Sequence, residues 1–184
     1  MSARRSPEES AVPREGVHRL RVRYAETDQM GVVYHANYLV WLEEGRTRLL
    51  EELGHAYHEV ERDGVALAVR RAELRYRQAA CYGDEIRVRT RIDHVGGASV
   101  RFSYDVEREA DGALLCTAMT ELVCLDLAQA GAQAGAQAGA QGGERSGDRG
   151  GRRPALFPET LRRALERIAQ APRGPGSNSS GSKR

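Results

Sequence analysis

One long helical pattern near the start of the chain, followed only by strand patterns, limits the folds that the chain can adopt. From 37 to 53 apolar residues recur at the 3.6-residue period of an amphipathic helix, and charged residues fill the opposite face. Apolar and polar residues alternate at 18–24, before the helix, and at 65–76, 86–92 and 100–106 after it, while 114–125 is apolar almost throughout. A single helix can bury its apolar face only against one antiparallel sheet. The sequence therefore predicts an α+β fold in which five antiparallel strands wrap around one long helix.

Three local features predict how these elements are shaped. The apolar phase of 65–76 changes near Arg70 and Arg71, which is typical of a bulge. Gly45 lies on or near the apolar stripe of the helix, where it costs about 1 kcal/mol relative to alanine. It therefore indicates close backbone packing against another element. Gly54 is the expected end of the helix.

The 184 residues divide into one patterned body and two polar ends. The body spans 17–127 and is the predicted domain of five strands and one long helix. The N-terminal arm, 1–16, is expected to be disordered. A low-complexity linker at 128–153 holds three copies of Ala-Gln-Ala-Gly, which bury nothing and predict disorder. In 154–184, Leu161, Leu165 and Ile168 predict a short amphipathic helix that docks on the body before a frayed tail.

Composition excludes several classes of protein. No apolar run approaches the roughly 20 residues that span a bilayer. Cys81, Cys116 and Cys124 are too scattered for a disulfide framework or a zinc site, which favours a reducing compartment. With no apolar signal stretch in the first residues either, we expect a cytoplasmic protein. The C-terminal part is basic, but no stacking aromatic residues accompany its arginines, so nucleic acid is not an expected partner.

The densest group of reactive side chains lies at 24–38, between the first strand and the helix. Backbone N–H groups at a helix start have no partner and carry positive potential, so they can stabilise an anionic oxygen. Asp28 lies upstream, across a turn that Gly31 permits. A carboxylate beside such an oxyanion site is the minimum for acyl transfer.

Plainer interpretations compete with this one. Asp28 could be an ordinary turn residue, His35 a helix cap, and Tyr24 a core residue of its strand. Glu26, Asp28 and His35 could also suggest a metal site. We do not expect a metal, because no second histidine occurs at short ligand spacing.

The segment resembles the active-site region of a known enzyme family. Tyr24, Thr27-Asp28, the run from Gly31 to His35, and Asn37-Tyr38 match the hotdog-fold acyl-CoA thioesterases of the 4-hydroxybenzoyl-CoA thioesterase type, in particular the YbgC-like branch. The likeness covers about 17–127 and the helix start near 154–161, and the later strands also fit it. The Ala-Gln-Ala-Gly insertion departs from the family pattern and leaves the role of the C-terminal segment open.

The resemblance implies specific roles. Asp28 is expected to act as nucleophile or as general base on water, with Tyr24 and His35 as polar partners and the backbone N–H of His35 as an oxyanion donor. The family uses no metal or redox cofactor and binds acyl-CoA at a subunit interface, so a homodimer with sheets joined edge to edge, or a homotetramer, is expected. For the CoA phosphates we select Arg70, Arg71 and Arg101, because guanidinium groups bind phosphate bidentately.

The predicted function is hydrolysis of an acyl-CoA thioester to a carboxylic acid and free CoA. The alternative is a non-catalytic scaffold that binds acyl-CoA or an acyl carrier, with a peripheral link to membrane or lipid-synthesis machinery. The intact Asp28 and His35 argue against that alternative, since a scaffold needs no such carboxylate. Dehydratase or isomerase chemistry on the same fold would fit a different loop pattern.

Overall fold

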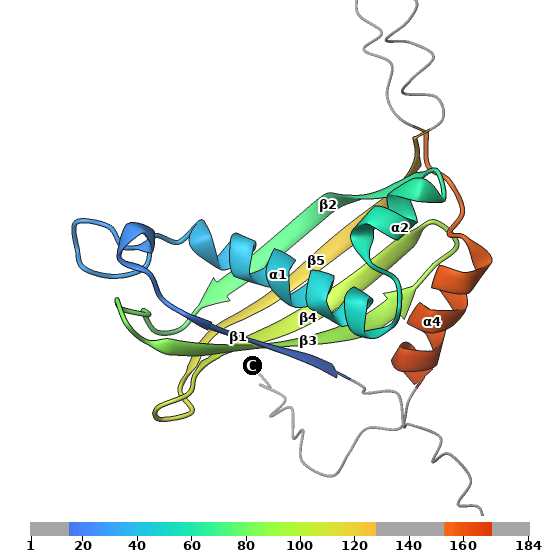
Figure 1. Cartoon of the computed structure of the whole chain (residues 1–184). Coiled ribbons are helices and arrows are strands. Elements are labelled where there is room, and N and C mark those ends of the chain that lie inside the picture. The colour runs from blue at the N-terminus through green and yellow to red at the C-terminus, as the bar shows by residue number, and fades with distance from the viewer. Residues whose placement is uncertain (1–14, 128–152, 171–184) are drawn as a thin grey trace, which may run out of the picture.

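The computed structural model describes residues 15–127 and 153–170 (Figure 1). In chain order the elements are β1 (Glu15–Arg21), the 3-10 turn η1 (Tyr24–Glu26), α1 (Asn37–Glu52), α2 (Tyr57–Arg62), β2 (Val65–Tyr76), β3 (Glu85–Val95), β4 (Ser99–Arg108), β5 (Leu114–Asp126) and α4 (Glu159–Gln170). The strands form one antiparallel sheet in the order β1-β3-β4-β5-β2, with α1 lying across one of its faces (Figure 1). The predicted α+β arrangement is confirmed, and β1 and β2 are the two edges of the sheet.

The core forms where the apolar stripe of α1 meets the buried face of the sheet. The buried residues of α1 are Tyr38, Trp41, Leu42, Gly45, Arg46, Leu49 and Leu50. Opposite them, β4 alternates buried Val100, Phe102, Tyr104 and Val106 with more exposed residues. Each fully buried aliphatic or aromatic side chain of this kind stabilises the fold by about 1.5–3 kcal/mol.

Three local predictions can be compared with this packing. A Cβ on Gly45 would lie 2.7 Å from Thr90 Oγ1, so the close packing at this glycine is confirmed. The pairing of β2 with β5 shifts between Val69 and Arg71, where the bulge was predicted. Gly54 follows α1 with a φ of +77°, and the helix ends there. Leu39, one of the apolar residues in the predicted helix 37–53, is by contrast 42% exposed.

The structure adds two elements that the sequence patterns did not indicate. The first strand ends at Arg21 rather than Tyr24, because the chain turns into η1. The short helix α2 lies between Gly54 and Gly64, and Val60 is its buried contact with the core.

The C-terminal helix α4 packs against the body of the fold, at the end of the sheet opposite η1 (Figure 1). Its residues Leu161, Leu165 and Ile168 are buried, and so is Phe157, two residues before the helix. Pro154 forms an isolated antiparallel bridge with Leu125 at the end of β5. Glu15 and Gly16, which the predicted disordered arm included, instead begin β1 and pair with β3. The rest of the predicted disorder, at 1–14 and 128–152, and the predicted frayed tail from Gly174 lie outside the described residues. In the described ranges, no helix combines the length and apolarity needed to cross a membrane.

Candidate active site

The loop between η1 and α1 is a small hairpin fixed by its own backbone hydrogen bonds. Asp28 N donates to Val32 O at 2.9 Å, and Gly31 N donates to Asp28 O at 3.0 Å. Gly31 has a φ of +74°, a left-handed conformation that a side chain would disfavour. Val33 N then donates to Ala80 O at 2.8 Å, which ties the hairpin to the loop before β3. The position of Asp28 is therefore set by the backbone on both sides.

Asp28 is half-buried, and only one of its two carboxylate oxygens accepts a hydrogen bond from the described residues. Its Oδ1 accepts a hydrogen bond of 2.8 Å from Met30 N. For Oδ2, residues 15–127 and 153–170 supply no hydrogen-bond donor. One carboxylate oxygen is thus held by the turn, and the other is available to a water or a substrate.

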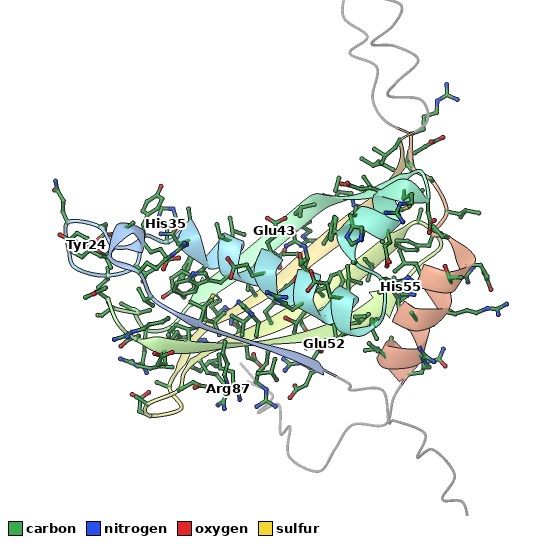
Figure 2. All side chains as sticks on the ribbon, in the orientation of Figure 1. Tyr24, His35, Glu43, Glu52, His55 and Arg87 are labelled. Carbon is green, nitrogen blue, oxygen red and sulfur yellow. The ribbon has the colours of Figure 1, made fainter. Side chains whose placement is uncertain are left out.

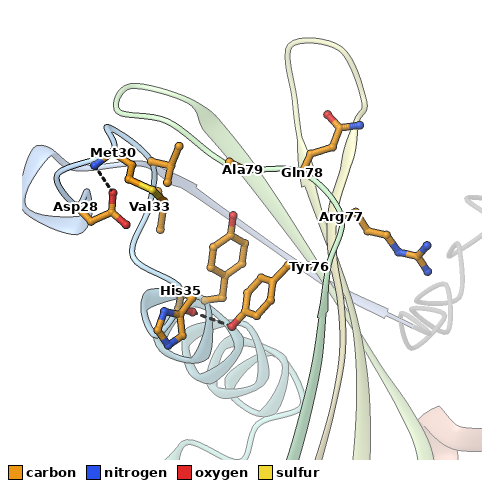
Figure 3. A pocket seen from close by; sticks show the side chains of 10 residues that line it. Asp28, Met30, Val33, His35, Tyr76, Arg77, Gln78 and Ala79 are labelled. Atoms are coloured by element: carbon orange, nitrogen blue, oxygen red, sulfur yellow. Dashed lines mark hydrogen bonds between the residues drawn. The ribbon is translucent and has the colours of Figure 1, made fainter.

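Asp28 and His35 line the same cavity, which has a volume of about 340 Å³ (Figure 3). Its other walls include the rings of Tyr38 and Tyr76 and the side chain of Val33. Arg77 also contributes to the wall, but its side chain points away from Asp28 and His35 (Figure 3). Apolar walls with a few convergent polar groups are typical of small-molecule sites.

The start of α1 presents unpaired backbone donors next to this cavity. Ala36, the N-cap residue, provides no side-chain cap. The side-chain amide of Asn37 donates instead to Glu26 O, at 2.8 Å. The backbone N–H groups of His35 and Ala36 find no acceptor within the described part of the chain. Together with the helix dipole, such groups favour an anionic oxygen. A carboxylate and unpaired backbone N–H groups therefore lie at the same end of α1, beside the cavity.

The three predicted catalytic residues do not all meet there. His35 is exposed at the cavity, with its ring 4.4 Å from that of Tyr34 between centroids. Tyr24 lies near the same end of α1 (Figure 2) but does not line the cavity. Its side chain is 77% exposed, and its ring packs edge-to-face on Tyr82 at 5.8 Å. Its carbonyl accepts two hydrogen bonds from Thr27, so its clearest contribution is to the turn before Asp28.

The arginines selected for the CoA phosphates lie outside this cavity and face carboxylates. Arg70 and Arg101 both pair with Glu121, the latter at 3.7 Å. Arg71 pairs with Glu73. Two carboxylates face these three guanidinium groups, so one positive charge is left over. The binding of CoA phosphates by these arginines stays a prediction.

Glu26 is a residue whose importance the sequence did not indicate. Its carboxylate is buried and accepts hydrogen bonds from Arg23 and from the indole of Trp41. Burial alone would raise the pKa of Glu26, but the hydrogen bonds from Arg23 and Trp41 outweigh it and lower the pKa. A usable signal was Trp41 itself, because a buried indole N–H needs an acceptor.

The cysteines offer no competing nucleophile in the cavity. Burial raises the pKa of the Cys116 thiol to about 11 and also raises that of Cys124. A thiol must ionise to attack a carbonyl, so these two are inert at neutral pH. Cys81 is exposed but does not line the cavity.

Comparison with known proteins identifies the family. Residues 22–165 match the family model described as the Thioesterase-like superfamily. YneP of Bacillus subtilis, which carries the name of an acyl-CoA thioesterase, is 42% identical over 107 residues, covering 58% of this chain and 77% of YneP. The acyl-CoA thioester hydrolase YbgC of Escherichia coli is 33% identical over 107 residues, covering 58% of this chain and 79% of YbgC.

A solved structure agrees with this match. The protein TT1821 of Thermus thermophilus superposes with a TM-score of 0.67 at 37% sequence identity, covering 83% of this chain and 98% of that protein. The predicted hotdog fold is therefore confirmed. Because the family model spans 22–165 and relatives named as acyl-CoA thioesterases are 33% and 42% identical, the chain belongs to the thioesterase-like superfamily and is an enzyme of the thioesterase class.

Proposed function

We propose that this enzyme hydrolyses acyl-CoA thioesters to a carboxylic acid and free CoA. The observation that carries the proposal is the position of Asp28, whose Oδ2 is unpaired within the described residues and which lines one cavity with His35 at the uncapped start of α1. The names of YneP and YbgC, both acyl-CoA thioesterases, support the substrate class.

The chemistry follows from these groups in one of two ways. Asp28 takes a proton from a water whose oxygen adds to the thioester carbonyl, or its carboxylate adds directly and forms a mixed anhydride that water then hydrolyses. In both routes the carbonyl oxygen becomes an oxyanion, which the N–H groups of His35 and Ala36 stabilise. The tetrahedral intermediate expels the thiolate of CoA, a good leaving group that ends as the free thiol.

A second copy of the chain would complete this site. β2 pairs only with β5 among the described strands, so its other edge is open beside the cavity. Val69 and Tyr76 on β2 are 48% and 45% exposed. An open edge strand presents unpaired backbone N–H and C=O groups, which are a template for pairing with another strand. We infer that two chains join along β2, as a dimer or as half of a tetramer, with each cavity closed by the partner.

The three cysteines, which are free thiols, support a reducing compartment, and we place the reaction in the cytoplasm.

Release of CoA thiol, followed with a chromogenic thiol reagent, tests the proposal. The wild-type protein should release thiol from a panel of short, long and aromatic acyl-CoAs, and Asp28→Asn should lower turnover by about 100-fold or more. Glu51→Gln, an exposed position on the far part of α1, serves as the matched control. Binding of acyl-CoA by the wild-type protein without thiol release would favour the scaffold alternative, and near-normal turnover by Asp28→Asn would refute the role of this carboxylate.

A further inference from the structure

Glu26 binds to groups on both sides of the candidate active-site loop. Its Oε2 accepts a hydrogen bond of 2.7 Å from Arg23 N, and its Oε1 accepts one of 3.0 Å from Arg23 Nη2. Oε1 also accepts the indole N–H of Trp41 at 3.1 Å. The residue is 5% exposed, and Trp41 is 1% exposed. The carboxylate therefore joins η1 to the second turn of α1 inside the protein.

The backbone of Glu26 makes a second connection to the same helix. Its carbonyl oxygen accepts hydrogen bonds from Tyr34 N at 2.9 Å and from Asn37 Nδ2 at 2.8 Å. Tyr34 directly precedes His35, and Asn37 is the first residue of α1. One residue thus holds the segment before His35, the first turn of α1 and the turn before Asp28.

We propose that Glu26 is a positioning residue for thioester hydrolysis, which sets the separation between the Asp28 carboxylate and the backbone N–H of His35. This inference rests on the proposed function. Glu26 does not line the cavity, so it does not touch the substrate. It acts through the loop, by fixing the hairpin that carries Asp28 to the helix whose start binds the oxyanion.

The geometry requires an ionised carboxylate rather than another polar group. Three N–H donors point at its two oxygens, and a glutamine would turn an N–H₂ toward at least one of them. A buried carboxylate is costly unless its oxygens are hydrogen-bonded, and here they are. Its lowered pKa keeps it ionised at neutral pH, so the connection is present under assay conditions.

The loss of this connection should appear in turnover more than in binding. A displacement of about 1 Å between reacting groups can cost about 100-fold in rate. For Glu26→Gln we therefore expect kcat to fall by about 10- to 100-fold, with KM for acyl-CoA changed by less than about 3-fold. Trp41→Phe removes one donor but keeps a ring in the core, so a smaller fall in kcat is expected. Glu51→Gln is again the control, since its exposed carboxylate pairs only with Arg48 among the residues that the structure describes.

Trp41 also supplies a direct readout, because it is the single tryptophan of the chain. Its fluorescence in Glu26→Gln should shift relative to the wild type and to Glu51→Gln, reporting the lost bond to its indole N–H. Thermal unfolding followed by circular dichroism ensures that kcat is measured on folded enzyme. If Glu26→Gln is unstable at the assay temperature, Trp41→Phe alone tests the inference. Its kcat should fall while its KM for acyl-CoA stays nearly unchanged.

The outcomes separate this inference from the proposed function. If Asp28→Asn is inactive while folded Glu26→Gln and Trp41→Phe keep the wild-type kcat, Glu26 has no positioning role and the hydrolase proposal stands. A rise in KM at unchanged kcat would equally overturn the inference. If the wild-type protein releases no thiol from any acyl-CoA, the proposed function fails, and the inference fails with it.

Discussion

The hydroxyl of Tyr76 donates a hydrogen bond of 3.0 Å to the carbonyl oxygen of His35 (Figure 3). Tyr76 is the last residue of β2, the open edge strand, and His35 lies just before α1. The tyrosine ring also packs edge-to-face on Tyr38 at 5.2 Å, within the cavity wall. The sheet edge inferred to bind a second copy therefore holds the backbone that presents the proposed oxyanion donors.

Removing this hydroxyl should reduce turnover. In Tyr76→Phe the carbonyl of His35 loses its donor, at a cost of about 1 kcal/mol. If that cost is felt in the transition state, kcat falls by roughly 5-fold. The measurement is thiol release at saturating acyl-CoA. Tyr82→Phe is the matched control, because Tyr82 is exposed and its ring packs on no aromatic ring but that of Tyr24 in the described part of the chain. Equal kcat for both variants would show that the bond plays no part in the reaction.

The fold could be predicted because periodicity reports burial directly. The 3.6-residue period of α1 and the alternation in β3 and β4 reflect which side chains face the core. The alternation misplaced Tyr24, since an apolar residue two positions after Val22 looks like the next core position of a strand. In the structure the chain has already entered η1, and the tyrosine is exposed.

The candidate site was predicted only where its residues are neighbours in sequence. Asp28 and His35 fall in one continuous motif, and they do line one cavity. Tyr76 was missed as a wall residue, because its contact with His35 spans 41 positions. Glu26 was missed for the same reason, since its acceptor role depends on Trp41, 15 residues away. A buried indole indicates that an acceptor exists, but no local pattern identifies Glu26 as that acceptor or Tyr76 as the partner of His35.

A methyl group at Gly45 should destabilise the protein. Alanine is favoured over glycine in a helix by about 1 kcal/mol. Here, however, the added Cβ would lie 2.7 Å from Thr90 Oγ1 and 3.0 Å from Val88 Cγ1. Overpacking of this kind costs about 1–3 kcal/mol, so the free energy of unfolding of Gly45→Ala should fall in urea titrations despite the better propensity.

A second substitution identifies the cause of that loss. Thr90 is fully buried, and its Oγ1 has no hydrogen-bond partner among the described residues. Thr90→Ala removes the atom nearest to the new methyl, so Gly45→Ala with Thr90→Ala should recover part of the lost stability. Strictly additive effects of the two substitutions would argue that the clash with Thr90 is not the reason.

A charge on the open edge of β2 should separate the chains. Val69→Lys places an ammonium where a partner strand would pair, and lysine is a common means of blocking strand edges. Light scattering should then give half the mass of the wild-type assembly or less, and thiol release should fall because the cavity loses the partner's wall. Val17→Lys, at a 36% exposed site on the opposite edge strand β1, should leave both unchanged. A monomeric wild-type protein with full activity would contradict the inferred assembly.

Stability should decline at alkaline pH because of groups buried in their neutral form. Burial raises the pKa of the Cys116 thiol from 9.0 to about 11 and that of the Tyr104 hydroxyl from 10.0 to about 12. At a pH between the unfolded and the folded pKa of either group, the unfolded chain has released a proton that the folded chain retains. The contribution of Cys116 is therefore complete below pH 9 and is lost as the pH rises toward 11.

Urea titrations at pH 8 and at about pH 10.5 measure this decline. Cys116→Val fills the same space without an ionisable group, so its free energy of unfolding should fall less between the two pH values than that of the wild type. Cys81→Ser, at an exposed thiol, should keep the wild-type pH dependence. If Cys116→Val and the wild type lose the same amount, the alkaline decline belongs to Tyr104 or another group, because the buried thiol is the only ionisable group that this substitution removes.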